Sequence, residues 1–191
     1  MDLATLTAKD IAAIRPFEGF SVILSDPPWA FSANSAEKPS KGARRHYATM
    51  KTKDIAAIPV SALAAKDSLC LMWATAPMIE DALRVLRAWS FKYKSQLVWD
   101  KGRIGTGYWA RNQHEIVLIG RRGRFPCDKP ALFPTSIIPG KRAEHSRKPL
   151  WLHEVIEARH PDLPKLELFA RAPRDGWTVL GNQTGKFGGD A

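Results

Sequence analysis

The residues best suited to chemistry are Asp26, Pro27, Pro28 and Trp29, which follow the apolar run 22–24 and Ser25. A short, continuous and largely β-branched run is typical of a buried strand. Pairing with a neighbouring strand should stop at the first proline, because proline has no N–H to donate. We therefore expect a corner at a strand end that offers hydrogen-bond acceptors, namely a carboxylate and free carbonyl groups, beside an aromatic ring.

Such a corner suits the amino group of adenine, a poor nucleophile because its lone pair is delocalised into the ring. The Asp26 carboxylate and the Pro27 carbonyl could hold the two amino hydrogens and localise the lone pair, with Trp29 stacked on a flipped base. A carboxylate with a pKa of about 3.9 cannot first deprotonate a neutral amine, so its role would be orientation and charge stabilisation. The alternative is a rigid Pro-Pro turn with Trp29 in the core, and these residues alone leave both interpretations open.

Composition bounds the function. The chain has 191 residues, 45% of them hydrophobic, which predicts a single domain over residues 1–191. A formal net charge of +10 favours a polyanionic partner such as nucleic acid, with a merely basic protein as the alternative. The two cysteines and five histidines are not spaced as in a zinc site, and the sequence shows neither a signal-peptide pattern nor a long apolar span. We expect a cytoplasmic protein without a metal ion and without membrane contact.

The elements that must position the corner alternate along the chain. Buried strands are expected at residues 22–25, 68–73, 95–100, 114–120, 165–170 and 177–180. Helices are expected between Thr7 and Pro16, after Thr52 as N-cap to Ile58, over 76–90, and from Pro149 to about Arg159. This alternation predicts an α/β fold with a mainly parallel sheet. Ligands of such sheets bind at the carboxyl ends of the strands, which would bring Asp26 together with the corners at 169–171 and 181–183.

The segments between these elements carry further candidates. Residues 30–46 form a basic loop with Arg44 and Arg45, interpreted as a lid that contacts phosphate or the target base; a solvated loop is the alternative. Trp109, next to Tyr108, either stacks on bases or packs beneath a loop. Residues 184–191 are expected to form a flexible Gly-rich tail.

Eight ordered blocks resemble one known family, the MT-A-70 adenine-N6 methyltransferases that use S-adenosylmethionine, in their bacterial or phage type. The blocks are 25–29, the Tyr47 segment, 71–75, 98–99, 106–109, 145–149, 165–171 and 177–183. The resemblance implies a Rossmann-like methyltransferase fold with helices on both faces of the sheet. It also implies a permuted order, in which the catalytic strand precedes the cofactor half.

The resemblance further implies a role for single residues. Residues 26–29 would hold the target amine, with Tyr47 over the target base. Contacts to the cofactor would come from Asp26 near its methionine end, Lys148 at its carboxylate, Arg171 and Asn182 at the ribose, Gln183 at the adenine edge, and Glu167, Leu168 and Phe169 lining the pocket. The pair Asp10 and Ile11 would match an Asp-Ile of the family that touches the cofactor adenine.

The expected reaction is therefore methyl transfer from S-adenosylmethionine to N6 of adenine in DNA. The same reaction on RNA is an alternative, because the site residues do not distinguish the two polymers. A catalytically silent subunit that binds nucleic acid is a second alternative, and assembly into a homodimer is left open.

Overall fold

The computed structural model describes residues 3–30, 49–107, 109–127, 131–140 and 148–181. Several predicted features lie outside these ranges: the basic loop after its first residue, the tail, Arg44, Arg45, Tyr47, Asn182 and Gln183.

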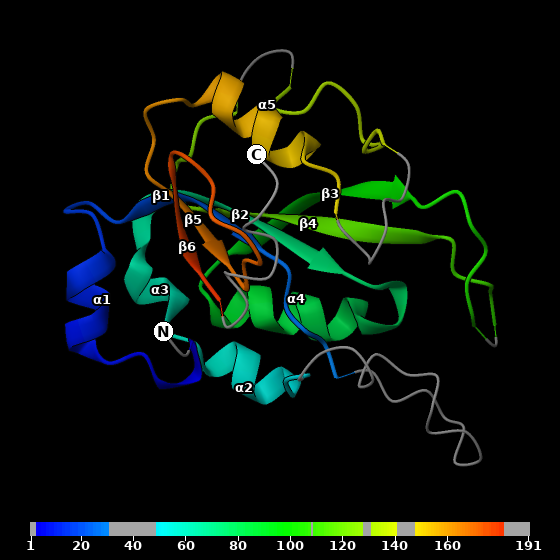
Figure 1. Ribbon diagram of the computed structural model, residues 1–191, viewed down its shortest axis with the longest axis horizontal. Helices are drawn as coiled ribbons and strands as arrows, with labels where there is room; N and C mark the ends of the chain where they lie inside the picture. Colours follow the sequence, from blue (N-terminus) through cyan, green and yellow to red (C-terminus); the bar gives the residue numbers. More distant parts are fainter. Residues whose placement is uncertain (1–2, 31–48, 108, 128–130, 141–147, 182–191) are drawn as a thin grey trace.

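A six-stranded sheet forms the centre of the molecule, in the order β3-β4-β2-β1-β5-β6 (Figure 1). The strands are β1 (Phe20–Ser25), β2 (Ala64–Ala74), β3 (Lys92–Asp100), β4 (His114–Arg122), β5 (Lys165–Leu168) and β6 (Trp177–Leu180). β1 pairs in parallel with β2 and β5, and β5 with β6, whereas β4 is antiparallel to both β2 and β3. All six predicted strands and the α/β class are thus confirmed.

The reversal of β4 has a simple cause. β3 and β4 are joined directly by residues 101–113, without a helix. A parallel neighbour needs a crossover connection, usually a helix, whereas a direct return pairs the strands antiparallel. The sheet is therefore parallel across β2, β1, β5 and β6 and mixed at the β3–β4 side.

Helices cover both faces of the sheet, and each face has its own apolar core (Figure 1). One face carries η1 (Leu3–Thr5), α1 (Ala8–Ile14), α2 (Thr52–Ala57), α3 (Val60–Leu63), η4 (Ala76–Met78) and α4 (Ile79–Ala88). The other face carries α5 (Trp151–Arg159), together with apolar residues of the segment 125–138. The resulting three layers keep β1 and β2 buried on both sides, as their continuous apolar runs require.

Local signals in the sequence explain the helices. Thr7 and Asp10 form a reciprocal capping box at the start of α1. α4 buries Ala82, Val85 and Leu86 on one face, and Gly120 lets it approach β4 closely, because a Cβ there would lie 2.7 Å from Leu86 Cδ1.

Some predicted boundaries were wrong. Thr52 is the first helical residue of α2, which has Lys51 as its N-cap and no side-chain cap. The predicted helix 76–90 consists of a 3-10 turn followed by α4, and α5 begins at Trp151, two residues after Pro149. β2 starts at Ala64, earlier than expected, because Lys66 and Asp67 are exposed and interrupt the apolar pattern.

The topology places Asp26 at a reversal in strand order. The chain leaves β1 toward β2 on one side and returns through α5 to β5 on its other side. Ligands of open α/β sheets bind at the carboxyl ends of strands at such a point. Asp26 follows β1 immediately, so the fold delivers its carboxylate to this position.

Two further features complete the fold. Cys70 of β2 has no exposed surface, and burial raises the pKa of its thiol, whereas Cys127 is exposed. Among the described ranges, no helix has the length and apolar character needed to cross a membrane.

Candidate active site

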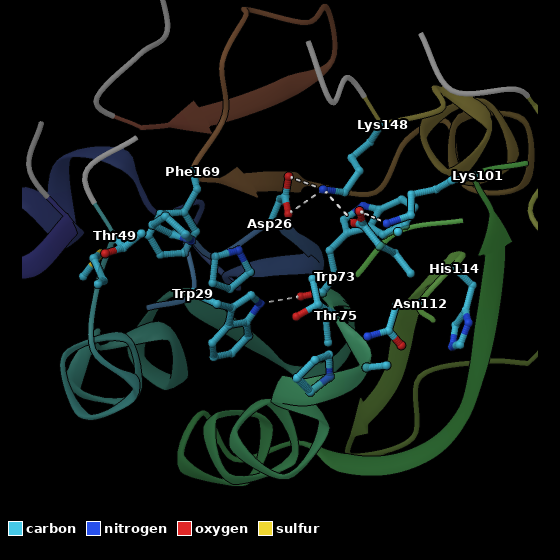
Figure 2. Close-up of a pocket in the computed structure, with 18 of the residues that line it drawn as sticks. Asp26, Trp29, Thr49, Trp73, Thr75, Lys101, Asn112, His114, Lys148 and Phe169 are labelled. Atoms are coloured by element: carbon cyan, nitrogen blue, oxygen red, sulfur yellow. Dashed lines mark hydrogen bonds and ion pairs between the residues drawn. The ribbon is translucent and has the colours of Figure 1, made fainter. Parts of the chain in front are cut away.

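A cavity of about 440 Å³ opens at the carboxyl end of β1. Its walls come from segments far apart in sequence: the corner after β1, the end of β2, the β3–β4 connection, the start of β4, Lys148, and the corner after β5 (Figure 2). The cavity thus brings together three predicted segments, namely residues 26–29, Lys148 and 169–171.

The corner after β1 is fixed by backbone hydrogen bonds. The N–H of Trp29 donates to the Pro27 carbonyl at 2.9 Å, and the N–H of Met50 donates to the Pro28 carbonyl at 2.8 Å. The expectation that both carbonyls are free was therefore wrong, because each already accepts one bond. A carbonyl has two lone pairs, so the Pro27 oxygen retains one acceptor position.

Trp29 lies in the core, as one of the two interpretations expected, and it also lines the cavity. Its side chain belongs to the core on the α4 face, and the residue is only 7% exposed. Its indole N–H donates to the Trp73 carbonyl at 3.0 Å (Figure 2). It nevertheless lines the cavity, so what it presents there is a fixed aromatic surface.

Four charged side chains line the cavity and contact one another in a row, namely Asp26, Lys148, Glu115 and Lys101 (Figure 2). The Lys148 ammonium donates to Asp26 Oδ1 at 3.1 Å and to Oδ2 at 3.0 Å. It also lies 3.1 Å from Glu115 Oε2, while Lys101 lies 3.4 Å from Glu115 Oε1. We call these four residues the lysine–carboxylate cluster.

The charge on Lys148 follows from its neighbours. Burial alone would lower the pKa of its ammonium, but the carboxylates of Asp26 and Glu115 outweigh this effect and raise the pKa above 10.5. The ammonium also lies over the Trp73 ring, 5.2 Å from its centroid. Lys148 therefore carries a positive charge at neutral pH.

The corner after β5 contributes Phe169, Ala170 and Arg171 to the cavity wall. Phe169 has a left-handed backbone with φ of +63°, which is unusual for a residue with a side chain, and it turns the chain toward Arg171. Arg171 Nη2 lies 4.0 Å from Asp26 Oδ2. Glu167 Oε2 lies at a hydrogen-bond distance of 2.9 Å from His153 Nε2, and both residues line a smaller adjoining cavity of about 170 Å³.

Other predicted residues lie elsewhere. Leu168 was expected to line the pocket, but it is fully buried in the core and lines neither cavity. Asp10 forms hydrogen bonds with Thr7 in the capping box of α1, and neither Asp10 nor Ile11 lines the cavities. Leu3 lines the larger cavity from the N-terminal segment instead.

Trp109 is fully exposed on the β3–β4 connection, so it does not pack beneath that loop.

Sequence reasoning missed Glu115 and Lys101 of the lysine–carboxylate cluster, and also Asn112, His114 and Thr75 of the cavity wall. One signal was available for Glu115, a carboxylate directly before the apolar run 116–119 of β4. Within the described ranges, no three His, Cys, Asp or Glu side chains gather as they would around a metal ion.

The family model described as MT-A70 matches residues 20–183. The chain belongs to the MT-A70 family. The MT-A70 match spans β1 to the end of β6, and therefore includes every strand that contributes to the cavity.

Individual relatives agree with the MT-A70 assignment. The Type II methyltransferase M.MunI of a Mycoplasma species is 29% identical over 182 residues, covering 87% of this chain and 78% of that protein. A probable N(6)-adenosine-methyltransferase MT-A70-like of Oryza sativa subsp. japonica is 32% identical over 174 residues, covering 86% of this chain but 23% of the rice protein. The catalytic subunit METTL3 of the Homo sapiens N(6)-adenosine-methyltransferase is 26% identical, and the match covers 28% of its length.

Proposed function

We propose that this MT-A70 domain transfers a methyl group from S-adenosylmethionine to N6 of adenine in DNA. The observation that carries the proposal is the Asp26 carboxylate at the strand-order reversal, facing a cavity with aromatic walls and cationic side chains. An acceptor at that place suits an amino group whose nitrogen becomes positively charged as it is methylated.

The described residues fit the cofactor. The cavity volume of about 440 Å³ lies in the range of about 300–1,000 Å³ that is usual for small-ligand sites. Lys148 is charged and suits the methionine carboxylate, and Arg171 suits the ribose hydroxyls. Asn182 and Gln183 are proposed as further contacts on the resemblance alone. When bound, S-adenosylmethionine supplies an electrophilic methyl group on a sulfonium centre.

The residues of the corner after β1 would prepare the target amine. One Asp26 oxygen and the remaining lone pair of the Pro27 carbonyl would each accept one amino hydrogen, which localises the nitrogen lone pair. As N6 becomes positively charged, Asp26 stabilises the charge and then accepts the proton that N6 loses. Water at the open side of the cavity would take the proton from Asp26.

The preference for DNA is supported by charge and by one relative. The formal net charge is +10, and the match covers 78% of the Mycoplasma Type II methyltransferase. The Trp109 side chain, exposed beside the cavity wall, would stack on a base, and the basic loop with Arg44, Arg45 and Tyr47 would contact phosphate and the target base. The expected permuted order is supported by the position of β1 before β5 and β6 in the chain.

RNA is the second candidate substrate. Several relatives are named N(6)-adenosine-methyltransferases, among them the rice and human proteins. Matched DNA and RNA oligonucleotides, assayed side by side with labelled cofactor, distinguish the two. Higher kcat/KM on DNA supports the proposal, and higher kcat/KM on RNA replaces it.

The decisive experiment measures the chemistry directly. The protein is incubated with methyl-labelled S-adenosylmethionine and duplex DNA, and the nucleosides are separated by mass spectrometry. We expect label in N6-methyl-2′-deoxyadenosine. A folded protein that binds the cofactor by calorimetry but leaves every nucleoside unlabelled would contradict the proposal and favour a silent binding subunit.

A further inference from the structure

Glu115 stands out because it is a charged residue in a covered position with two cationic partners. It is the second residue of β4, opposite Trp99 of β3, and its side chain is 15% exposed. Its two oxygens contact two different lysines, Lys148 at 3.1 Å and Lys101 at 3.4 Å. Burying a charged carboxylate costs free energy unless it pairs with an opposite charge. The two lysine contacts therefore hold the Glu115 carboxylate in place.

Lys148 presents a conflict at the proposed site. Its ammonium contacts both oxygens of Asp26, at 3.1 and 3.0 Å. The proposed chemistry needs one of these oxygens for a hydrogen of the target amine. An ammonium that paired with Asp26 alone would compete with that amine for the carboxylate.

Glu115 eases this competition by offering the same ammonium a second carboxylate at 3.1 Å. We infer that Glu115 is a positioning residue, which shares the Lys148 ammonium with Asp26 and thereby weakens the hold of Lys148 on the carboxylate that the target amine needs. Lys101 holds Glu115 from its other oxygen. The inference rests on the proposed function of this site and assigns it a residue outside the predicted set.

Glu115→Gln removes the charge and keeps the shape. Lys148 would then pair with Asp26 more exclusively, so kcat should fall on the order of 10²-fold, as for other small misplacements of catalytic groups. KM for DNA and the affinity for the cofactor should change much less, because the Lys148 ammonium is still present. Glu115→Asp keeps the charge and should recover part of kcat.

A second measurement needs no activity. The loss of one carboxylate should lower the pKa of Lys148, because that carboxylate helps to raise it. The pKa can be followed through the 13Cε signal of Lys148, assigned with Lys148→Arg. Glu18→Gln is the matched control, because Glu18 is exposed before β1, at the end opposite Asp26.

The outcomes separate the inference from the proposed function. A wild-type protein that methylates adenine, together with Glu115→Gln at wild-type kcat, overturns the inference alone. Glu115→Asp with kcat no higher than that of Glu115→Gln also overturns it. If the wild type transfers no methyl group, the proposed function fails, but the Lys148 titration still tests whether Glu115 acts on Lys148. An unchanged Lys148 pKa in Glu115→Gln overturns the inference. A lower Lys148 pKa in Glu115→Gln, but not in Glu18→Gln, supports it.

Discussion

Asp26 is the residue on which the proposed chemistry depends, and its side chain is 25% exposed at the cavity wall. Asp26→Asn keeps the shape but loses the charge that stabilises the methylated nitrogen. We expect kcat to fall by about 10²- to 10⁴-fold, the range for removal of an acid–base group. DNA affinity, measured by fluorescence anisotropy, should stay near the wild-type value.

Asp162→Asn is the control for this prediction, because Asp162 is exposed in the turn before β5. It removes the same charge away from the cavity, and we expect wild-type kcat. Equal losses in both variants would show that net charge matters rather than the position of Asp26.

Glu157 provides a prediction on pH. Its carboxylate accepts two hydrogen bonds from Arg174, at 2.6 and 2.7 Å, and one from the Trp177 indole, and the bonds from Arg174 are the largest cause of a pKa below 4.5. A carboxyl group with a lowered folded pKa stabilises the fold above its unfolded pKa and loses this contribution as the pH falls through the folded value.

Glu157→Gln should therefore destabilise the protein at pH 7 by about 1 kcal/mol, a modest figure because solvent screens this partly exposed pair. The free energy of unfolding in urea, measured at pH 7 and pH 3 for both proteins, checks the prediction. The difference between variant and wild type should narrow at pH 3. A difference that does not depend on pH would contradict an electrostatic origin.

At the scale of elements, β6 supports the corner after β5. A Cβ on Gly181 would lie 2.4 Å from the Ala170 carbonyl oxygen and 2.8 Å from its nitrogen, so the backbone itself would have to move. The displaced segment carries Phe169 and Arg171 of the cavity wall. We expect Gly181→Ala to weaken cofactor binding more than ten-fold by calorimetry and to cost about 1–3 kcal/mol of stability. Unchanged cofactor affinity would mean that this corner does not bind the cofactor.

The sequence predicted the strands and helices far better than the contacts between their side chains. Apolar runs located all six strands, because burial on both faces leaves a local pattern. The direction of β4 depends on how the chain returns after β3, and apolar runs carry no information on direction. Glu115 was missed for a similar reason, because its partner Lys148 is distant in sequence and lies just before α5, outside the sheet.

The resemblance predicted the segments that meet at the cavity, including residues 26–29, Lys148 and Arg171. It did not predict that Lys148 contacts Asp26, because a family pattern assigns residues to ligands rather than to each other. The hydrogen bonds that occupy the Pro27 and Pro28 carbonyls were missed for a related reason, since one of them comes from Met50, across the segment 31–48.

For the whole molecule, the charge predicts a salt-dependent interaction. Arg103 is exposed in the β3–β4 connection, which contributes to the cavity wall, and we propose that it contacts a DNA phosphate. Removing one side chain that neutralises a phosphate should reduce the slope of log K against log[salt] by about 0.9. Binding titrations of Arg103→Ala at several salt concentrations check this value.

Lys94→Ala is the matched control. Lys94 is exposed near the start of β3, and β3 runs in the same direction as β1, so this residue lies at the sheet end opposite the cavity. We expect its slope to equal that of the wild type. Equal reductions in the two variants would indicate binding without a defined face.

The burial of Cys70 means that the protein can be labelled at a single cysteine without mutation. The sequence contains two cysteines, and only the thiolate form reacts readily with maleimide dyes. Cys70 has neither exposed surface nor a thiolate at neutral pH, whereas Cys127 is exposed. Intact-mass spectrometry of the native protein should therefore show one attached dye, and two after unfolding, so a fluorophore can be introduced without removing either cysteine.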